Sequence, residues 1–226
     1  SQTKTIMVTS SIPGEGKTTV AVNLAISLVR QGKKVVLVDC DLRNPSIADF
    51  LGITEQRPGI DSVLHKKAAV TDVLTEIDVN GENKLTLLLG EEEEKTDISL
   101  LGSKRMEGLI AELKNMADVV ILDTAPAQLL ADAALMARFV DAALYVIRYD
   151  YTKMYKIREG IQALAMSKIK MLGYVFNCDR NSGDGKYGYG YGYGYRRYGS
   201  YGHYGRYRDT GKRDKKEDLS GRVIKD

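Results

Sequence analysis

A ten-residue segment, SSIPGEGKTT at residues 10–19, places the strongest constraint on how this chain can fold. It follows an apolar run at residues 5–9 and leads into a helical pattern over residues 17–30. From Gly16 onward it matches the GxxxxGK[ST] template of a phosphate-binding loop, with Ser11 in place of the first glycine. Glycines let backbone N–H groups turn inward around phosphate oxygens, and the helix N-terminus adds positive potential. We therefore predict that a nucleotide binds through Gly14, Glu15, Gly16, Lys17, Thr18 and Thr19.

Short β-branched runs alternate with helical patterns over the first 180 residues. The predicted strands lie at residues 5–9, 35–38, 85–89, 119–122, 143–147 and 171–176. The predicted helices lie at residues 17–30, 103–116, 129–139 and 156–167, and residues 52–84 are less periodic. Continuous apolar strands separated by helices are typical of a mainly parallel sheet that is covered on both faces. We predict an α/β fold of the P-loop NTPase type, with a doubly wound sheet and helices on both faces.

Three aspartates follow predicted strands, where acidic partners of a bound metal are expected. Asp39 and Asp41 come after the run at residues 35–38, and Asp123 comes after the run at residues 119–122. Ligands of open α/β sheets collect at the carboxyl ends of the strands. Because strand side chains alternate, Asp39 and Asp41 should leave the strand on the same face. One carboxylate can then hold the water shell of Mg²⁺, while the other accepts a proton from an incoming hydroxyl.

The composition changes abruptly after Arg180. Residues 181–226 carry 11 Lys and Arg against 6 Asp and Glu, a net charge of +5, whereas residues 1–180 carry 22 against 24, a net charge of −2. The second segment has few aliphatic residues, so it cannot bury enough apolar area to offset chain entropy, and we predict that it is disordered. It also holds nine of the 14 tyrosines of the chain: Tyr187, Tyr189, Tyr191, Tyr193, Tyr195, Tyr198, Tyr201, Tyr204 and Tyr207.

Several protein classes are disfavoured by the sequence. Cys40 and Cys178 form no CxxC pair, which argues against a disulfide scaffold, a zinc site or an iron–sulfur site. No apolar run approaches the ~20 residues that a membrane-spanning helix needs, and no signal peptide opens the chain. The first residue is Ser1 rather than Met, so we expect the chain to be a fragment of a longer protein.

Three segments together resemble the Walker A, A′ and B motifs of bacterial tyrosine kinases, or BY-kinases. They are SSIPGEGKTT at residues 10–19, VLVDCDLR at residues 36–43 and VILDTAP at residues 120–126. The resemblance covers about residues 1–180, and a C-terminal tyrosine cluster is the family's other hallmark. Ala125 departs from the pattern, because the family usually has a second proline at that position.

The resemblance implies a role for each matching residue and implies ATP and Mg²⁺ as cofactors. Lys17 would bind phosphate, Thr18 and Asp123 would hold Mg²⁺, and Asp39 would be a second residue of the metal shell. Asp41 would be the catalytic base, and Arg43 would orient a phosphate or a neighbouring group. Asn177, just past the last predicted strand, would contact the adenine. The nine clustered tyrosines at residues 187–207 would be the phosphoacceptors.

The resemblance also implies partners and a location. Autophosphorylation would occur chiefly between neighbours in a ring-shaped homo-oligomer, at the cytoplasmic face of the membrane. A transmembrane adaptor, fused or separate, would activate the kinase, and a protein-tyrosine phosphatase would reverse the modification. The process regulated would be capsular or exopolysaccharide synthesis and export.

Two other readings stay open at the level of sequence. One is a partitioning-type P-loop ATPase, although such proteins need a second lysine where Ile12 stands. The other is RNA binding or self-association through the interleaved Arg, Tyr and Gly of residues 195–207, because arginine and aromatic rings stack on single-stranded bases. The charge density of this segment is modest, so we expect no nucleic-acid partner.

Overall fold

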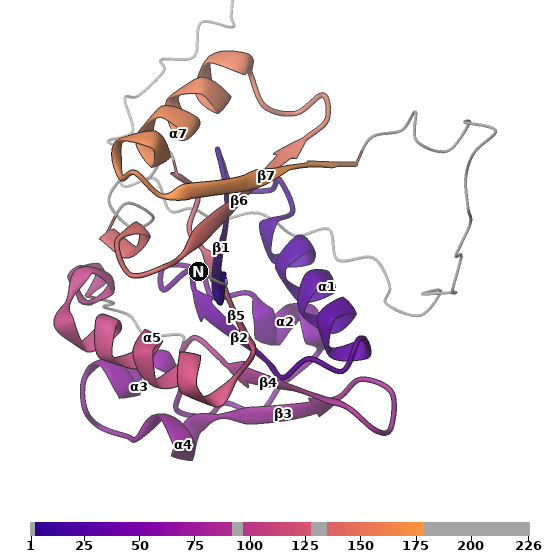
Figure 1. The fold of residues 1–226 in the computed structure, drawn as a ribbon, viewed down its shortest axis with the longest axis vertical. Coiled ribbons are helices and arrows are strands. Elements are labelled where there is room, and N and C mark those ends of the chain that lie inside the picture. Colours follow the sequence, from indigo (N-terminus) through magenta and orange to yellow (C-terminus); the bar gives the residue numbers. More distant parts are fainter. Residues whose placement is uncertain (1–2, 92–96, 128–134, 179–226) are drawn as a thin grey trace, which may run out of the picture. The chain divides into compact units, whose positions relative to one another are not determined.

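The computed structural model describes residues 3–91, 97–127 and 135–178, and a seven-stranded sheet runs through these residues (Figure 1). The strand order is β3-β4-β2-β5-β1-β6-β7. The strands are β1 (Thr5–Ser10), β2 (Val35–Cys40), β3 (Thr75–Asp78), β4 (Lys84–Leu88), β5 (Val119–Thr124), β6 (Ala142–Arg148) and β7 (Lys170–Asn177). The helices are α1 (Lys17–Arg30), α2 (Ile47–Leu51), α3 (Ile60–Leu64), α4 (Val70–Val73), α5 (Lys104–Met116) and α7 (Met154–Met166), with a 3₁₀ helix at Ile98–Gly102.

The sheet is parallel except at one edge, where β3 pairs antiparallel with β4. The central strands β1, β2 and β5 are almost entirely buried, which explains their continuous apolar sequences. Alternate side chains of these strands face two separate cores. Met7, Val36 and Val120 face the core covered by α3, α4, α5 and α7, whereas Val8 and Leu37 face the core covered by α1 and α2. The predicted mainly parallel sheet with helices on both faces is thus confirmed.

The six predicted strands and three of the four predicted helices are present, with ends that differ by one or two residues. The less periodic residues 52–84 contain α3, α4 and the edge strand β3. These elements have four or five residues each, too few to show a helical or alternating period. The predicted helix at residues 129–139 and the predicted C-terminal segment at residues 181–226 lie wholly or partly outside the described residues.

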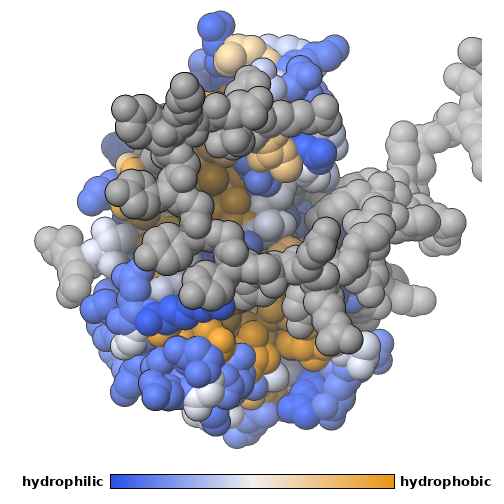
Figure 2. Space-filling view, turned by 90° about the vertical axis from the view of Figure 1, so that its right-hand side faces the viewer, coloured by the Kyte–Doolittle hydropathy of each residue, from blue (hydrophilic) through white to orange (hydrophobic). Residues whose placement is uncertain are grey.

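Apolar residues are exposed on β7, which is the edge of the sheet opposite to β3. Leu172, Tyr174 and Phe176 of β7 are 43%, 48% and 67% exposed. Figure 2 shows apolar patches surrounded by hydrophilic residues on one face of the molecule. No helix within the described ranges is both long and apolar enough to cross a membrane.

The packing of α7 against β6 depends on a glycine. Tyr145 is fully buried, and its hydroxyl donates a hydrogen bond to Ser11 Oγ in the phosphate-binding loop (3.0 Å). A Cβ atom at Gly160 of α7 would overlap this tyrosine hydroxyl. The absence of a side chain at Gly160 therefore lets α7 approach the residue that supports the start of the loop.

We predict opposite effects for two Gly→Ala changes in helices. Gly160→Ala should destabilise the protein by ~1–3 kcal/mol, since the added methyl group displaces a rigid buried tyrosine. Gly108→Ala in α5 should stabilise it by ~0.5–1 kcal/mol, because a Cβ at Gly108 meets no atom within 4 Å and alanine favours the helix. Urea unfolding of both variants tests this pair, and a stabilised Gly160→Ala protein would contradict the packing argument.

Candidate active site

The loop between β1 and α1 has the backbone shape of a phosphate-binding loop. Gly14 and Gly16 have φ angles of 83° and 87°, in the left-handed region that favours glycine. The helix α1 starts directly after Gly16, and the Lys17 and Thr18 side chains at its first turn are buried. This arrangement presents the N-terminus of a 14-residue helix to the loop, as anion binding requires.

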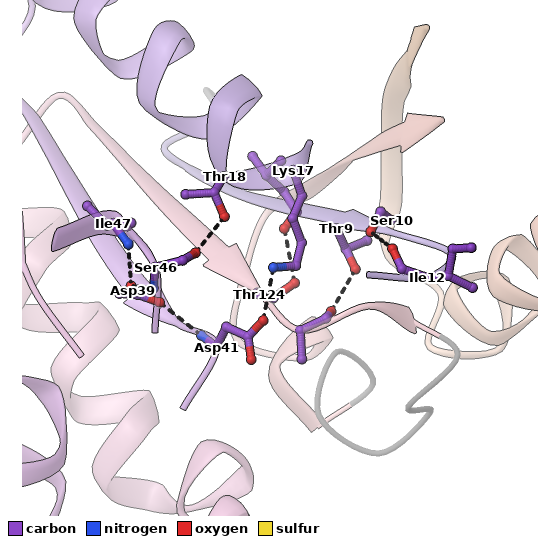
Figure 3. A network of polar contacts seen from close by, with 12 residues as sticks. Thr9, Ser10, Ile12, Lys17, Thr18, Asp39, Asp41, Ser46, Ile47 and Thr124 are labelled. Atoms are coloured by element: carbon purple, nitrogen blue, oxygen red, sulfur yellow. Dashed lines mark hydrogen bonds and ion pairs between the residues drawn. The ribbon is translucent and has the colours of Figure 1, made fainter. Parts of the chain in front are cut away.

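Lys17 forms a buried ion pair with Asp41. Its Nζ lies 2.9 Å from Asp41 Oδ2, and neither side chain is more than 9% exposed (Figure 3). Asp41 Oδ1 is buried and has no hydrogen-bond partner among the described residues. The loop lysine therefore lies against the carboxylate for which the family resemblance predicts the role of base.

Asp39 has a different set of partners. Its Oδ2 accepts hydrogen bonds from the backbone N–H groups of Ser46 (2.8 Å) and Ile47 (2.9 Å) at the start of α2 (Figure 3). Its Oδ1 accepts a longer one from the backbone N–H of Asp41 (3.3 Å). The Asp39 carboxylate thus fixes the chain between β2 and α2. This segment lies beside the phosphate-binding loop, since Ser46 contacts Thr18.

The register of the sheet places Asp39 next to Asp123. The two residues are paired between the parallel strands β2 and β5 and lie on the α1 side of the sheet. Burial, opposed in part by Lys17 and Thr18, raises the pKa of Asp123 to about 6. Burial, the charge of Asp123 and that of Asp41 raise the pKa of Asp39 to about 7, although the Ser46 and Ile47 amides act in the opposite direction. Negative charge is therefore crowded at this edge.

The donor set at this edge fits a magnesium ion that is shared with phosphates. Both carboxylate oxygens of Asp123 are buried and have no hydrogen bond of normal geometry among the described residues. The Thr18 hydroxyl, which lowers the pKa of Asp123, forms its hydrogen bond with Ser46 Oγ at 2.9 Å. No three acidic, histidine or cysteine side chains in the described ranges converge to hold a metal by themselves. Mg²⁺ usually takes only one or two carboxylates and completes its shell with water and phosphate oxygens.

The other predicted site residues are distributed around the loop. The side chain of Glu15 is fully buried, whereas Thr19 and Arg43 are exposed. Asn177, at the end of β7, donates a hydrogen bond from Nδ2 to the backbone carbonyl of Glu15 (2.9 Å). Its predicted contact with adenine stays a prediction, as do the assigned roles of the other site residues. The nine predicted phosphoacceptor tyrosines at residues 187–207 lie outside the described residues.

Four residues around the loop escape prediction from the sequence. Ser46 contacts Thr18, and its position just before a short helix is the one signal that could have revealed it. Arg148 and Thr152 contact the loop from more than 130 positions away, and Tyr151 lies against Gly14. These three residues follow or end β6 without any motif, so only the fold brings them to the loop.

We predict that the metal-free, nucleotide-free protein becomes more stable as the pH falls from 8 to 5. A carboxyl group whose pKa is raised in the folded state binds protons more tightly there than in the unfolded chain. The free energy of unfolding therefore increases as the pH falls through about 7 for Asp39 and about 6 for Asp123. Asp123→Asn should raise the melting temperature at pH 8 and flatten its dependence on pH. A melting temperature that falls steadily from pH 8 to 5 in the wild type would contradict this.

Comparisons with known proteins agree with this geometry. The family model described as an AAA domain matches residues 3–174. The tyrosine-protein kinase YwqD of Bacillus subtilis (strain 168) is 38% identical over 189 residues, which cover 83% of this chain and 77% of that protein. The crystal structure of the VpsO kinase domain superposes with a TM-score of 0.72 at 32% identity, covering 77% of this chain and 84% of that one.

A further solved structure extends the likeness to nucleotide-binding proteins. The septum site-determining protein MinD of Pyrococcus horikoshii OT3, solved in complex with Mg-ADP, has a TM-score of 0.64 at 25% identity. The match covers 77% of this chain and 70% of that one. Sequence, fold and loop geometry agree, and the chain belongs to the bacterial tyrosine kinases, enzymes that transfer phosphate to protein tyrosines on a P-loop fold.

Proposed function

We propose that this kinase transfers the γ-phosphoryl group of ATP to the tyrosines of its own C-terminal cluster, mostly between neighbouring chains. The observation that carries the proposal is the buried pair of Lys17 and Asp41 at the end of a phosphate-binding loop. The ammonium group of Lys17 is suited to binding phosphate, and the carboxylate of Asp41 is suited to accepting a proton. The nine tyrosines at residues 187–207 supply acceptors in the same chain.

The residues of the loop would hold ATP with Mg²⁺. The likeness to MinD, whose structure contains Mg-ADP, supports this choice of cofactors. The loop amides and the N-terminus of α1 would bind phosphate oxygens. Thr18 and Asp123 would bind the metal directly, and Asp39 would orient its water shell. When bound, the metal would neutralise charge on the phosphates and relieve the crowding of carboxylates.

In this proposal phosphate binding releases Asp41 for catalysis. Because Lys17 Nζ lies against Asp41 in the nucleotide-free protein, phosphate oxygens would compete for the ammonium group. The freed carboxylate would accept the proton of a tyrosine hydroxyl, whose solution pKa is about 10. The tyrosine oxygen would form its bond to the γ-phosphorus as the bond to the bridging oxygen of ADP breaks.

In this proposal the C-terminal segment would reach an active site on its own chain or on a neighbour. If it is disordered as predicted, about 17 residues from Cys178 to Tyr195 span ~20–25 Å. Each phosphorylation adds about −1.5 to −2 charges, so nine would change the segment from +5 to about −9 to −13. Such a reversal would drive the segments apart and so release neighbouring chains.

Partners and location belong to the same proposal. We propose a ring-like homo-oligomer, a transmembrane adaptor that places the kinase at the cytoplasmic face of the membrane, and a protein-tyrosine phosphatase. The regulated process would be capsular or exopolysaccharide synthesis and export. The exposed apolar row on β7, at Leu172, Tyr174 and Phe176, supports association with another protein surface.

We predict that incubation with ATP and Mg²⁺ places phosphate on tyrosines within residues 187–207, and that Lys17→Met abolishes it. The methionine removes the ammonium that holds the phosphates, at similar length. Mass spectrometry of the full chain, with an adaptor's activating segment present, maps the sites. Unmodified tyrosines under these conditions in the wild type would refute autophosphorylation.

We predict that Asp41→Asn binds nucleotide at least as well as the wild type but transfers phosphate ~10²–10⁴-fold more slowly, the usual contribution of a general base. The substitution removes the competitor of the phosphates for Lys17 while it removes the proton acceptor. Nucleotide titration and single-turnover labelling separate the two effects. Normal labelling by Asp41→Asn would show that another group is the base.

A further inference from the structure

We propose that Glu15 is a positioning residue, which keeps the phosphate-binding loop in its binding shape through a clasp formed by Arg148, Thr152 and Asn177. The inference rests on the proposed use of ATP. It gives Glu15 a task that differs from nucleotide contact, because the carboxylate faces protein donors rather than the space for phosphate.

The carboxylate of Glu15 is surrounded by hydrogen-bond donors. Oε2 accepts a hydrogen bond from the backbone N–H of Ile12 (2.8 Å), and this bond links the start of the loop to its end. Oε1 accepts from the Thr152 hydroxyl (2.6 Å) and, at 3.4 Å, from the backbone N–H of Arg148. The residue is fully buried. The described hydrogen bonds to its carboxylate therefore come from donors in the loop, at the end of β6 and just after β6.

The backbone carbonyls of the loop are bound by the same part of the sheet. Arg148 donates from a guanidinium nitrogen to the Gly14 carbonyl (3.0 Å), and its guanidinium stacks 4.5 Å from the ring centre of Tyr151. Asn177 donates to the Glu15 carbonyl (2.9 Å) and fills the space where a Cβ of Gly16 would lie. Two successive carbonyls are thus drawn outward, toward β6 and β7.

This orientation has a consequence for anion binding. A carbonyl and the N–H of the next residue belong to one trans peptide unit and point in opposite directions. When the carbonyls of Gly14 and Glu15 point outward to donors, the N–H groups of Glu15 and Gly16 therefore point inward, which is the arrangement a phosphate needs. An acidic side chain in the loop would repel phosphate if it pointed inward as well. Burying it beneath the loop against N–H and O–H donors removes that repulsion and fixes the loop.

The clasp is specific for a carboxylate. The two oxygens of the Glu15 carboxylate accept hydrogen bonds from three donors, those of Ile12, Arg148 and Thr152, and carry no hydrogen themselves. A glutamine of the same shape would bring two N–H hydrogens toward either Ile12 N–H or the donors from the β6 side. One donor would then face another donor, and a buried donor without a partner is costly.

The test compares Glu15→Gln and Thr152→Val with Thr152→Ser and with Asp141→Asn. Asp141 is the matched control, since its carboxylate accepts from the backbone N–H groups of Lys4 and Thr5 and from Lys114 Nζ, at the opposite ends of the strands. For each full-length variant, the dissociation constant of Mg-ADP is measured by calorimetry and the melting temperature without nucleotide by thermal unfolding. Initial rates over a range of ATP concentrations provide kcat and KM.

We expect Glu15→Gln to weaken Mg-ADP binding by about 10- to 100-fold, as one unpartnered buried donor would. Thr152→Val should weaken it by ~3- to 10-fold, the net value of one hydrogen bond, with Thr152→Ser restoring wild-type affinity. The loss should appear as a raised KM for ATP, with kcat at saturating ATP reduced far less. Asp141→Asn should lower the melting temperature and leave the dissociation constant unchanged.

Two results would overturn the inference. One is Glu15→Gln binding Mg-ADP within twofold of the wild type. The other is a loss of affinity in Asp141→Asn as large as that in Glu15→Gln, since affinity would then follow overall stability. If the wild type itself bound no Mg-ADP, the proposed use of ATP would fail first, so the two failures are distinguishable.

Discussion

The buried ion pair between Lys17 and Asp41 is the interaction on which the site depends. Lys17 is one buried ammonium group beside three buried carboxylates, those of Asp39, Asp41 and Asp123. A buried charge is costly unless it is paired, so this edge of the sheet is electrostatically unbalanced without a cation. Burial is the main cause that raises the pKa values of Asp39 and Asp123, and neighbouring carboxylates raise them further. In the proposed function, these buried charges are stabilised most when metal and phosphates bind together. The metal would neutralise the carboxylates, and the phosphates would bind the lysine.

Two acidic residues that the sequence assigns to the ligand also accept hydrogen bonds from backbone N–H groups. Asp39 holds the amides at the start of α2, and Glu15 holds the amide of Ile12. Carboxylates are strong acceptors for such groups, and each of these contacts shapes a loop that borders the nucleotide site. The buried carboxylate of Glu15 thereby accepts hydrogen bonds from Ile12, Arg148 and Thr152. Asp39 therefore contributes both to the shape of the chain before α2 and to the negative charge at the strand ends, whereas Glu15 contributes to the shape of the loop.

Much of the fold could be predicted because its signals are local. The buried strands β1, β2 and β5 are continuous apolar runs, and the loop between β1 and α1 matches the GK[ST] part of the phosphate-binding template. The edge strand β3, with the sequence TEID and alternate half-exposed positions, lacks that signal. The short helices α2, α3 and α4 also lack a recognisable sequence signal, since four or five residues are too few to show an amphipathic period.

The class of fold, the phosphate-binding loop and the aspartates at the strand ends could be predicted from the residues alone, because each of these is encoded by neighbouring residues. The groups that each acid contacts are visible only in the folded chain. The parallel register of β2 and β5 sets Asp39 beside Asp123, and a shift by one residue would turn one of them to the other face. The clasp on Glu15 joins residues more than 130 positions apart. Such contacts follow from the order of strands in the sheet, which no local pattern records.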